Sequence, residues 1–315
     1  MNGLVEQEFP DWARLPNTRY FEVTSAIAGA RYAIWVTVPP QYKSDPEASY
    51  TVLFAPDGNG MAPAAAPRLQ MLSADPVAPI EPFILVCIGY CGEDAGRTLA
   101  VRARDLIPPG EPLPEGAEQS MSKVVAMGLL DQAGADLYLN HLRNPAADKF
   151  LGFITDELFP LIAAAWRVKP GEHGLFGYSY GGLFAAYAAL RRPSLLTRIG
   201  AGSPGILAGT SRIFDLYRAE LSNDGDHSGR RLHLTVCESE LTVPGYYQAA
   251  VGLGTAEFLT LTGTRPLKGL KVTSRIIPLE SHATGGLASW ADFLRSCLPG
   301  RPGQSPLSAP SPIGW

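Results

Sequence analysis

The sequence predicts an α/β protein in which helices cover both faces of a mostly parallel central sheet. Two continuous apolar runs, at residues 50–55 and 83–90, are typical of strands buried on both faces of a parallel sheet. Segments with apolar residues at helical spacing alternate with such runs along the chain, which is the order of α/β folds. The third observation is local, because a short strand, a glycine-rich turn and an alanine-rich helix follow one another around Ser179.

The length and composition favour one domain. The chain has 315 residues, of which 46% are hydrophobic, and this is enough to bury a large core. We expect a single domain over residues 1–298, with an inserted cap at about residues 108–149, where proline and glycine interrupt the periodicity. Residues 299–315 are rich in proline, glycine and serine, so we expect a disordered tail there.

The charge argues against polyanionic partners. Lys and Arg number 26 and Asp and Glu number 30, so the net charge of −4 provides no basic surface for nucleic acid or an anionic membrane. The N-terminus shows no basic segment followed by an apolar run, and no apolar run is long enough to span a bilayer. We therefore expect a cytoplasmic protein with a small-molecule partner. The sequence does not indicate its oligomeric state.

The cysteine spacing indicates free thiols. The four cysteines are Cys87, Cys91, Cys237 and Cys297. Their spacing fits neither a disulfide framework nor a set of zinc ligands, and thiols stay reduced in the cytosol. We expect no metal site.

The remaining elements follow from periodicity and from turn residues. Strands are expected at residues 19–23, 31–38, 50–55, 83–90, 174–176, 198–201, 232–237 and 272–278, and helices at residues 61–72, 150–166, 210–221, 254–262 and 285–297. The first two strands predict an antiparallel hairpin at a sheet edge. Pro160 predicts a kink or break in its helix, and the charged segment 91–105 is expected to be a loop beside the ligand crevice.

Residues 177–181 read Gly-Tyr-Ser-Tyr-Gly, the G-x-S-x-G pattern of a nucleophile elbow. A strand that reverses sharply into a helix holds Ser179 in a strained conformation, and a Cβ at either glycine would clash with neighbouring backbone. The strain presents the serine hydroxyl to solvent. The first free N–H groups of the helix, beginning at Tyr180, point to the place where an oxyanion would form, and the helix dipole adds partial positive charge there.

A serine nucleophile needs a general base, and the base needs an acid that holds its tautomer. In this kind of fold the chain order is serine, acid and histidine, each after a strand. His282 and Glu240 follow the last two expected strands in that order, so we assign them as base and acid. Glu238 on the same loop is an alternative acid, and a dyad of Ser179 and His282 without an essential acid is another.

Residues after two other strands are candidates for substrate contacts. Ligands of open α/β sheets bind beyond the carboxyl ends of the strands, where the chain places Asp57, Gly58 and Asn59. Either Gly58 or Asn59 is a candidate for the second oxyanion N–H, although the residues fit an ordinary Asp-Gly turn equally well. Arg102 has a guanidinium suited to carboxylate, phenolate or phosphate, but a charged run is also typical of a solvated face.

The two tyrosines beside the nucleophile allow two interpretations. Tyr178 and Tyr180 either stack an aromatic acyl group or only pack the elbow. We place Tyr178 with Asp57 and Arg102 among the candidate substrate-binding residues.

Several short motifs occur in a fixed order along the chain. They are D-G-N at residues 57–59, I-G-Y at 88–90, R-x-x-D and a proline within 102–108, the run from 148 to 160, the elbow and its helix at 177–193, and Ser-Pro at 203–204. Together they resemble the putative-esterase (esterase D-like) branch of the α/β hydrolases. Within that branch the chain is most similar to siderophore esterases that open catecholate trilactones, over about residues 36–290.

The resemblance implies an α/β-hydrolase fold with an antiparallel edge hairpin at its N-terminus and a cap insertion. By position, Ser179 matches the family nucleophile, Glu240 its acid and His282 its base. The D-G-N loop and the N–H of Tyr180 match its oxyanion contributors, and Arg102 falls where the family has an arginine near the substrate pocket.

The chain also departs from the family pattern. The family often follows the Ser-Pro with a tryptophan-bearing segment, whereas residues 205–209 here read G-I-L-A-G. Cys237 stands where glycine is common, and residues 136–147 look like additional cap sequence. The altered segment after the Ser-Pro implies a differently shaped acyl pocket.

We expect a serine esterase that cleaves a bulky, aromatic or macrolactone ester of a siderophore-like kind through an acyl-enzyme, with no metal or organic cofactor. An acyltransferase on the same scaffold is the alternative, because the triad does not distinguish water from an alcohol as acceptor. A non-catalytic ligand-binding relative is the third hypothesis. It is disfavoured because all three triad positions carry competent residue types.

Overall fold

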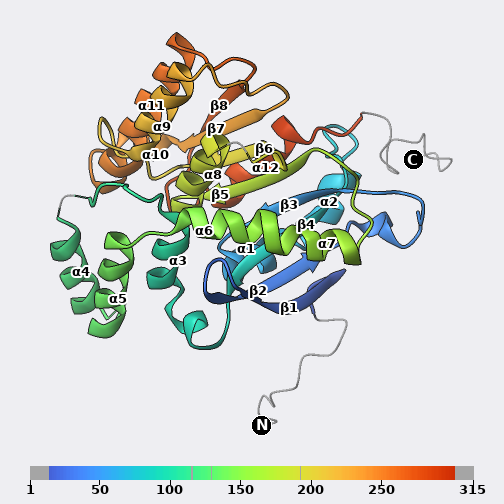
Figure 1. The fold of residues 1–315 in the computed structure, drawn as a ribbon, viewed down its shortest axis with the longest axis horizontal. Coiled ribbons are helices and arrows are strands. Elements are labelled where there is room, and N and C mark those ends of the chain that lie inside the picture. Colours follow the sequence, from blue (N-terminus) through green and yellow to red (C-terminus); the bar gives the residue numbers. More distant parts are fainter. Residues whose placement is uncertain (1–13, 115, 129, 192, 302–315) are drawn as a thin grey trace, which may run out of the picture.

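An eight-stranded sheet runs through the centre of the structure (Figure 1). The computed structural model describes residues 14–114, 116–128, 130–191 and 193–301. The strands are β1 Thr18–Ser25, β2 Ala30–Thr37, β3 Thr51–Ala55, β4 Phe83–Tyr90, β5 His173–Tyr178, β6 Leu196–Gly202, β7 Arg231–Cys237 and β8 Lys271–Ile277. They lie in the order β1-β2-β4-β3-β5-β6-β7-β8, and the fold is the predicted α/β-hydrolase fold.

The predicted edge hairpin is present. Strands β1 and β2 pair antiparallel, with Thr18 opposite Thr37 and Ser25 opposite Ala30. Strand β2 is also antiparallel to β4, whereas all further neighbours, from β4 and β3 to β7 and β8, are parallel. Because the carboxyl ends of parallel strands meet at one edge of a sheet, the segments after β3, β5, β7 and β8 come together there.

Helices cover both faces of this sheet (Figure 1). The helices are α1 Gly58–Ala65, α2 Arg68–Ala74, α3 Thr98–Leu106, α4 Ala117–Ala126, α5 Gln132–Arg143, α6 Ala147–Gly152, α7 Phe159–Ala165, α8 Tyr180–Arg191, α9 Arg212–Ser222, α10 Glu238–Thr242, α11 Leu253–Thr264 and α12 Gly286–Cys297. Buried residues of α1, α2 and α12 share one apolar cluster. Those of α3, α6, α8, α9 and α11 share the cluster on the opposite face.

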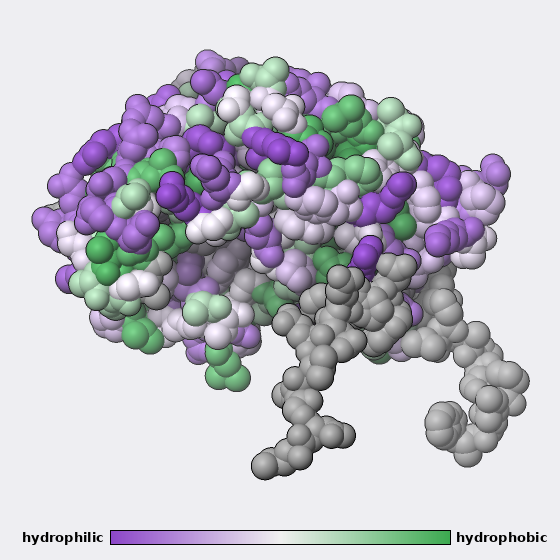
Figure 2. Space-filling model, turned by 90° about the horizontal axis from the view of Figure 1, so that it is seen from below, coloured by the Kyte–Doolittle hydropathy of each residue, from purple (hydrophilic) through white to green (hydrophobic). Residues whose placement is uncertain are grey.

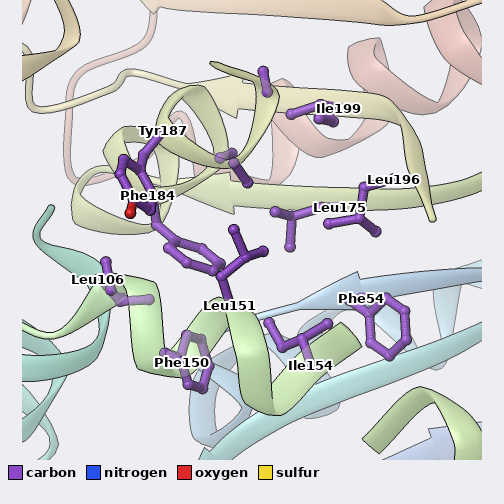
Figure 3. Close-up of a cluster of buried hydrophobic side chains, with 14 of the residues drawn as sticks. Phe54, Leu106, Phe150, Leu151, Ile154, Leu175, Phe184, Tyr187, Leu196 and Ile199 are labelled. Atoms are coloured by element: carbon purple, nitrogen blue, oxygen red, sulfur yellow. The ribbon is translucent and has the colours of Figure 1, made fainter. Parts of the chain in front are cut away.

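Successive side chains of a β-strand point to opposite faces of the sheet, so the strand residues alternate between these two clusters. In β3, Leu53 and Ala55 join the cluster under α1 and α12, whereas Val52 and Phe54 join the cluster under α6 and α8. All four are fully buried, which explains the continuous apolar run in the sequence. Figure 3 shows part of the second cluster, in which side chains of helices and strands interdigitate.

Two expectations about the first half of the chain were wrong. Residues 61–72 do not form one helix, because Pro67 separates α1 from α2 and α1 already begins at Gly58. Residues 91–105 are not a loop. They form the 3-10 helix η3 Gly92–Arg97 followed by α3, so Arg102 is held on a helix.

The helix expected at residues 150–166 contains a π-helical segment before Pro160. Helix α6 continues into a π-helical turn, η4 Phe153–Leu158, and then into α7, which has Pro160 in its first turn. Proline has no N–H for the helical ladder, and the wider turn before it accommodates that loss. The chain stays helical through Pro160, so the predicted break is absent, and the irregularity is the π-helical turn directly before the proline.

Helices α4 and α5 occupy the segment expected to be a cap. Tyr138 and Leu142 of α5 pack against Ala100 and Ala103 of α3. The role of the segment as a cap stays a prediction. Pro299, in the expected tail, pairs with Ile80 in an isolated β-bridge, and residues 302–315 lie outside the described residues.

Within the described part of the chain, no helix is both long and apolar enough to cross a bilayer. The four cysteines are free and buried.

Candidate active site

Ser179 lies at the sharp junction between β5 and α8. Its φ angle of 61° is in the left-handed region, where a residue with a Cβ is strained by about 1–2 kcal/mol. The Ser179 N–H donates to the carbonyl oxygen of Gly202 over 2.9 Å, which ties the turn to β6. The predicted strained elbow is therefore present.

The glycines around Ser179 permit this close turn. A Cβ on Gly177 would lie 2.0 Å from the carbonyl oxygen of Gly181, and one on Gly182 would lie 2.4 Å from that of Gly202. Neither backbone atom can move without breaking the elbow. Outside its own helix, a Cβ on Gly181 would meet the Asp57 carboxylate at 3.3 Å, which is tight but less restrictive.

A continuous hydrogen-bonded chain joins the three predicted catalytic residues. The Oγ of Ser179 lies 2.9 Å from Nε2 of His282, and Nδ1 of His282 lies 2.6 Å from Oε1 of Glu240. His282 is on the loop after β8, and Glu240 is on α10 directly after β7. Residues 103 and 42 positions apart in sequence are thus brought into contact.

The local structure of α10 explains why Glu240 takes this position. Residues 238–240 are the first turn of a short helix, not the expected loop. Cys237 is the N-cap residue, and Oε2 of Glu240, at the third helical position, accepts the Cys237 N–H over 2.7 Å. Oε2 also accepts the hydroxyl of Ser203 over 2.8 Å.

These contacts separate Glu240 from the alternative acid Glu238. Glu240 is completely buried, and both of its carboxylate oxygens are hydrogen-bonded. Glu238 instead accepts the N–H of Leu279 over 2.6 Å on a more exposed part of the same helix. The structure brings Glu240, and not Glu238, to the imidazole.

Two tyrosines hold the imidazole of His282 in place. The Tyr178 hydroxyl donates to the His282 carbonyl oxygen over 2.9 Å, and burial raises the pKa of this phenol. The ring of Tyr247 stacks on the imidazole with a centroid distance of 4.1 Å and an interplanar angle of 16°. Sequence reasoning missed Tyr247 and the role of Ser203 as a partner of Glu240. The Ser-Pro motif was a signal for Ser203, but no motif points to Tyr247.

The predicted oxyanion donors have different surroundings. Tyr180 is the first residue of α8, and its N–H donates to no described residue. Gly58 lies against β4, where a Cβ would be 2.6 Å from the backbone of Ile88, and the Asn59 side chain hydrogen-bonds both the N–H and the carbonyl of Tyr90. Both residues thus hold α1 against β4, and their assignment as oxyanion donors stays a prediction.

Arg102 and Asp57 form a two-bond ion pair beside Ser179. Nε and Nη2 of Arg102 donate to the two carboxylate oxygens over 2.8 and 2.7 Å. Burial alone would lower the pKa of Arg102, but the attraction of Asp57 outweighs it and raises the pKa. The guanidinium also lies 5.2 Å from the ring centroid of Tyr180, whose hydroxyl is 2.5 Å from that of Tyr138 on α5.

Two pockets meet at Ser179. The first, the His282 pocket, has a volume of about 180 Å³ and is lined by His282, Leu99, Leu113 and Tyr246, among other residues. The second, the Asp57 pocket, has a volume of about 280 Å³ and lies on the side of α1 and α12. Its apolar lining residues are Pro56, Met61, Ala64, Phe176 and Leu287. Among the residues that the structure describes, only Ser179 and Arg102 line both pockets.

Three of the other four histidines pair with groups outside this centre. His173 is buried, its Nδ1 accepts the N–H of Val52, and burial lowers its pKa to about 4. His233 pairs with Asp292, and His227 with Glu220. No cluster of three or more histidine, cysteine, aspartate or glutamate residues suited to a metal ion occurs among the described residues.

Comparison with known sequences agrees with the resemblance seen in the motifs. Residues 112–217 match the family described as putative esterase. Over 189 residues the chain is 32% identical to the siderophore enterobactin esterase of Emericella nidulans, covering 57% of this chain and 56% of that protein. Over 96 residues it is 29% identical to the uncharacterized protein YbbA of Bacillus subtilis, covering 27% and 38%. The chain thus spans about half, or less, of the curated relatives that it matches.

Comparison with solved structures supports the fold. The siderophore hydrolase EstB from Aspergillus nidulans superimposes with a TM-score of 0.70 at 22% identity, covering 92% of this chain and 98% of that chain. The BES protein from Bacillus cereus superimposes with a TM-score of 0.69 at 21% identity, covering 93% and 98%. The predicted resemblance to the putative-esterase branch, and within it to siderophore esterases, is confirmed.

Proposed function

We propose that this protein hydrolyses carboxylic esters through a covalent acyl-serine intermediate. The observation that carries the proposal is the hydrogen-bonded chain from the buried Glu240 carboxylate through His282 to the strained Ser179. A serine hydroxyl becomes a competent nucleophile when a base accepts its proton during attack. The buried acid holds the tautomer in which Nε2 faces the hydroxyl and stabilises the imidazolium that forms.

Acylation follows from this geometry. Oγ of Ser179 attacks the ester carbonyl carbon while His282 Nε2 takes its proton. The carbonyl oxygen becomes an oxyanion beside the N–H of Tyr180 at the positive end of α8. His282 then gives the proton to the alcohol oxygen, the bond between the carbonyl carbon and that oxygen breaks, and the acyl group stays on Ser179.

Deacylation repeats the same steps with water. His282 takes a proton from water, and the water oxygen attacks the acyl carbon. The second tetrahedral species collapses as the carbon–Oγ bond breaks, and His282 returns the proton to Ser179. The products are a carboxylic acid and an alcohol.

We propose siderophore-type esters, with catecholate trilactones first among them, as the substrate class. The proposal is supported by the sequence similarity to a siderophore enterobactin esterase and by the aromatic lining of the His282 pocket. A cavity of about 150 Å³ holds one benzene ring. The His282 pocket, at about 180 Å³, is therefore sized for one aromatic arm of a larger ester, while the rest lies outside.

Steady-state kinetics on a small panel of esters tests both the serine mechanism and the substrate class. The panel contains aryl acetates of rising acyl length, a feruloyl ester and a catecholate trilactone with and without iron. We expect Ser179→Ala to lower kcat/KM by about 10⁴-fold or more, because the residual rate comes only from binding and the oxyanion site. Ser222→Ala on the exposed surface of α9 is the matched control and should match wild type.

Different results would contradict the serine mechanism and the siderophore substrate class. Turnover that Ser179→Ala leaves unchanged would contradict the serine mechanism. A preference of wild type for the trilactone over aryl acetates of about a hundredfold in kcat/KM supports the siderophore class. Indiscriminate hydrolysis that depends on Ser179 would leave the esterase and remove the siderophore assignment.

A further inference from the structure

The two pockets at Ser179 differ in their access to the catalytic imidazole. His282 lines the first pocket and is absent from the described lining of the second. Arg102 lines both, and its two hydrogen bonds to Asp57 and its contact with the Tyr180 ring hold it between them. An ester bound at Ser179 therefore has two separate spaces for its two halves.

The path of the proton decides which half enters which space. In acylation the proton on His282 Nε2 passes to the leaving alcohol oxygen, so this oxygen has to come within about 2.6–3.2 Å of Nε2. The alcohol half is bonded to that oxygen and extends from the side of Ser179 that the imidazole occupies. That side opens into the His282 pocket.

The acyl half has to leave this space free. During deacylation a water molecule takes the place of the alcohol beside Nε2, while the acyl group is still bonded to Ser179. The Asp57 pocket offers that group an apolar surface from Met61, Phe176 and Leu287. Both pockets are lined by Ser179, so the acyl carbon can be at their junction.

We propose that the His282 pocket binds the alcohol half of the ester and the Asp57 pocket binds its acyl half. The inference rests on the proposed esterase function and deepens it. Tyr180, Tyr246 and Tyr247 line the His282 pocket, so its ligand is an alcohol that carries a flat aromatic group. The Asp57 pocket takes the part of the acyl half next to the ester carbonyl, against its apolar side chains.

Exposed hydrophobic side chains in the lining of the His282 pocket fit the same assignment. Leu99 and Leu113, both in the lining of the His282 pocket, are 44% and 46% exposed. Figure 2 shows groups of hydrophobic residues on the side of the molecule where Figure 1 places α4 and α5. A bulky alcohol half in this pocket therefore meets the exposed apolar side chains of Leu99 and Leu113.

Matched tryptophan substitutions test the assignment. Met61→Trp narrows the Asp57 pocket from α1, and Leu99→Trp narrows the His282 pocket from α3. Leu161→Trp is the control, because Leu161 is exposed on α7 and lines neither pocket. Two ester series are compared: one with a fixed 4-nitrophenyl alcohol and a growing acyl chain, the other with a fixed butanoyl group and growing aromatic alcohols.

The rate of deacylation provides the sharpest readout, because esters with the same acyl group form the same intermediate. Met61→Trp should lower kcat/KM about tenfold for long acyl chains and alter the deacylation rate whatever the alcohol was. Leu99→Trp should lower kcat/KM about tenfold for large alcohols and keep the deacylation rate within about twofold of wild type. Leu161→Trp should match wild type in both series.

Each contrary result has a separate meaning. The reverse pattern, with Leu99→Trp acting on acyl length and deacylation, would overturn the division of the pockets. Equal effects of both variants on both series would also overturn it. Absence of turnover by wild type on every ester would instead refute the proposed function on which the division rests.

Discussion

The carboxylate of Glu240 depends on few partners for its position. It is fully buried, and one oxygen is held by the Cys237 N–H and the Ser203 hydroxyl while the other faces His282. Hydrogen bonds to charged groups contribute about 1.5–3 kcal/mol each. The orientation of the acid is therefore sensitive to a residue that never contacts the substrate pocket.

Ser203→Ala should lower kcat/KM on aryl esters by roughly tenfold or more, because one of two fixed donors to the buried Glu240 oxygen is lost. Steady-state kinetics at saturating and limiting substrate provides the measurement, and Ser222→Ala provides the control. An unchanged kcat/KM in Ser203→Ala would show that this contact does not position the acid.

Glu111 is a single residue that should make the stability of the protein depend on pH. Burial raises the pKa of its carboxyl group to about 7, although its Oε2 accepts the N–H of Arg212 at the start of α9. Its Oε1 is buried and has no hydrogen-bond partner among the described residues. In the unfolded chain this group has an ordinary glutamate pKa, so folding holds a proton that the unfolded state releases.

The stability of the protein should therefore decrease as the pH rises from about 4.5 to about 7, with the full penalty above pH 7. Glu111→Gln removes this ionisation. The gain in free energy of unfolding of the variant over wild type should therefore be roughly 2–3 kcal/mol larger at pH 8 than at pH 5. Urea unfolding of both proteins at the two pH values measures it. A difference between the proteins that is the same at both pH values would contradict the assignment.

At the scale of elements, the elbow between β5 and α8 depends on glycines that lie very close to neighbouring backbone atoms. Gly177 and Gly182 face carbonyl oxygens at distances that exclude a Cβ. Gly263, inside α11, has nothing within 4 Å of an added Cβ. The two kinds of glycine therefore predict opposite effects of the same substitution.

Gly177→Ala should destabilise the fold by about 3 kcal/mol, because the added methyl group has to displace the backbone of Gly181. It should also reduce activity in the fraction that remains folded. Gly263→Ala should instead stabilise the protein by up to about 1 kcal/mol through helix propensity. Chemical denaturation measures both, and a Gly177→Ala protein as stable as wild type would refute the packing argument.

At the scale of the whole molecule, helices α4 and α5 are joined to the catalytic centre through α5. Tyr138 on α5 contacts the hydroxyl of Tyr180 at the elbow, and α5 packs on α3, which carries Arg102. Burial raises the pKa of both phenols, so both are neutral hydrogen-bonding groups. We propose that the described residues form one domain in which the α4 and α5 segment is a cap over the site.

Tyr138→Phe should lower the free energy of unfolding by about 1 kcal/mol and raise KM, because the buried Tyr180 hydroxyl loses its partner in the cap. The kcat value for small esters should change little, since Tyr138 does not contact the triad. Tyr20→Phe, which removes a hydroxyl bound to Glu22 on the exposed edge strand β1, is the control. Equal KM values in wild type and Tyr138→Phe would argue against the cap.

Local patterns in the sequence determined much of this protein. The apolar runs predicted strands β3, β4 and β7 because a strand buried on both faces has no polar side. The elbow around Ser179 followed from five consecutive residues, and the chain order of nucleophile, acid and histidine identified His282 and Glu240. Each of these features depends on the conformation of a short segment or on order along the chain, which the sequence contains directly.

The sequence missed or left open what depends on contacts between distant segments. Helix α3 is short and charged, so its apolar stripe was not recognised, and Arg102 was placed on a loop. Its pairing with Asp57 joins residues 45 positions apart, and no local pattern specifies such a distance. The stacking of Tyr247 on His282 likewise depends on a contact between segments that are far apart in the sequence.

The choice between Glu238 and Glu240 shows the difference between what the sequence and the tertiary structure determine. Both are carboxylates after the same strand, so residue type and spacing could not separate them. The first turn of α10 places Glu240 under the Cys237 N–H and beside Ser203, and places Glu238 with Leu279. The sequence determined that an acid would stand at this strand end, and only the tertiary structure decided which one, because the hydrogen-bond donors come from β6, β7 and the β8 loop together.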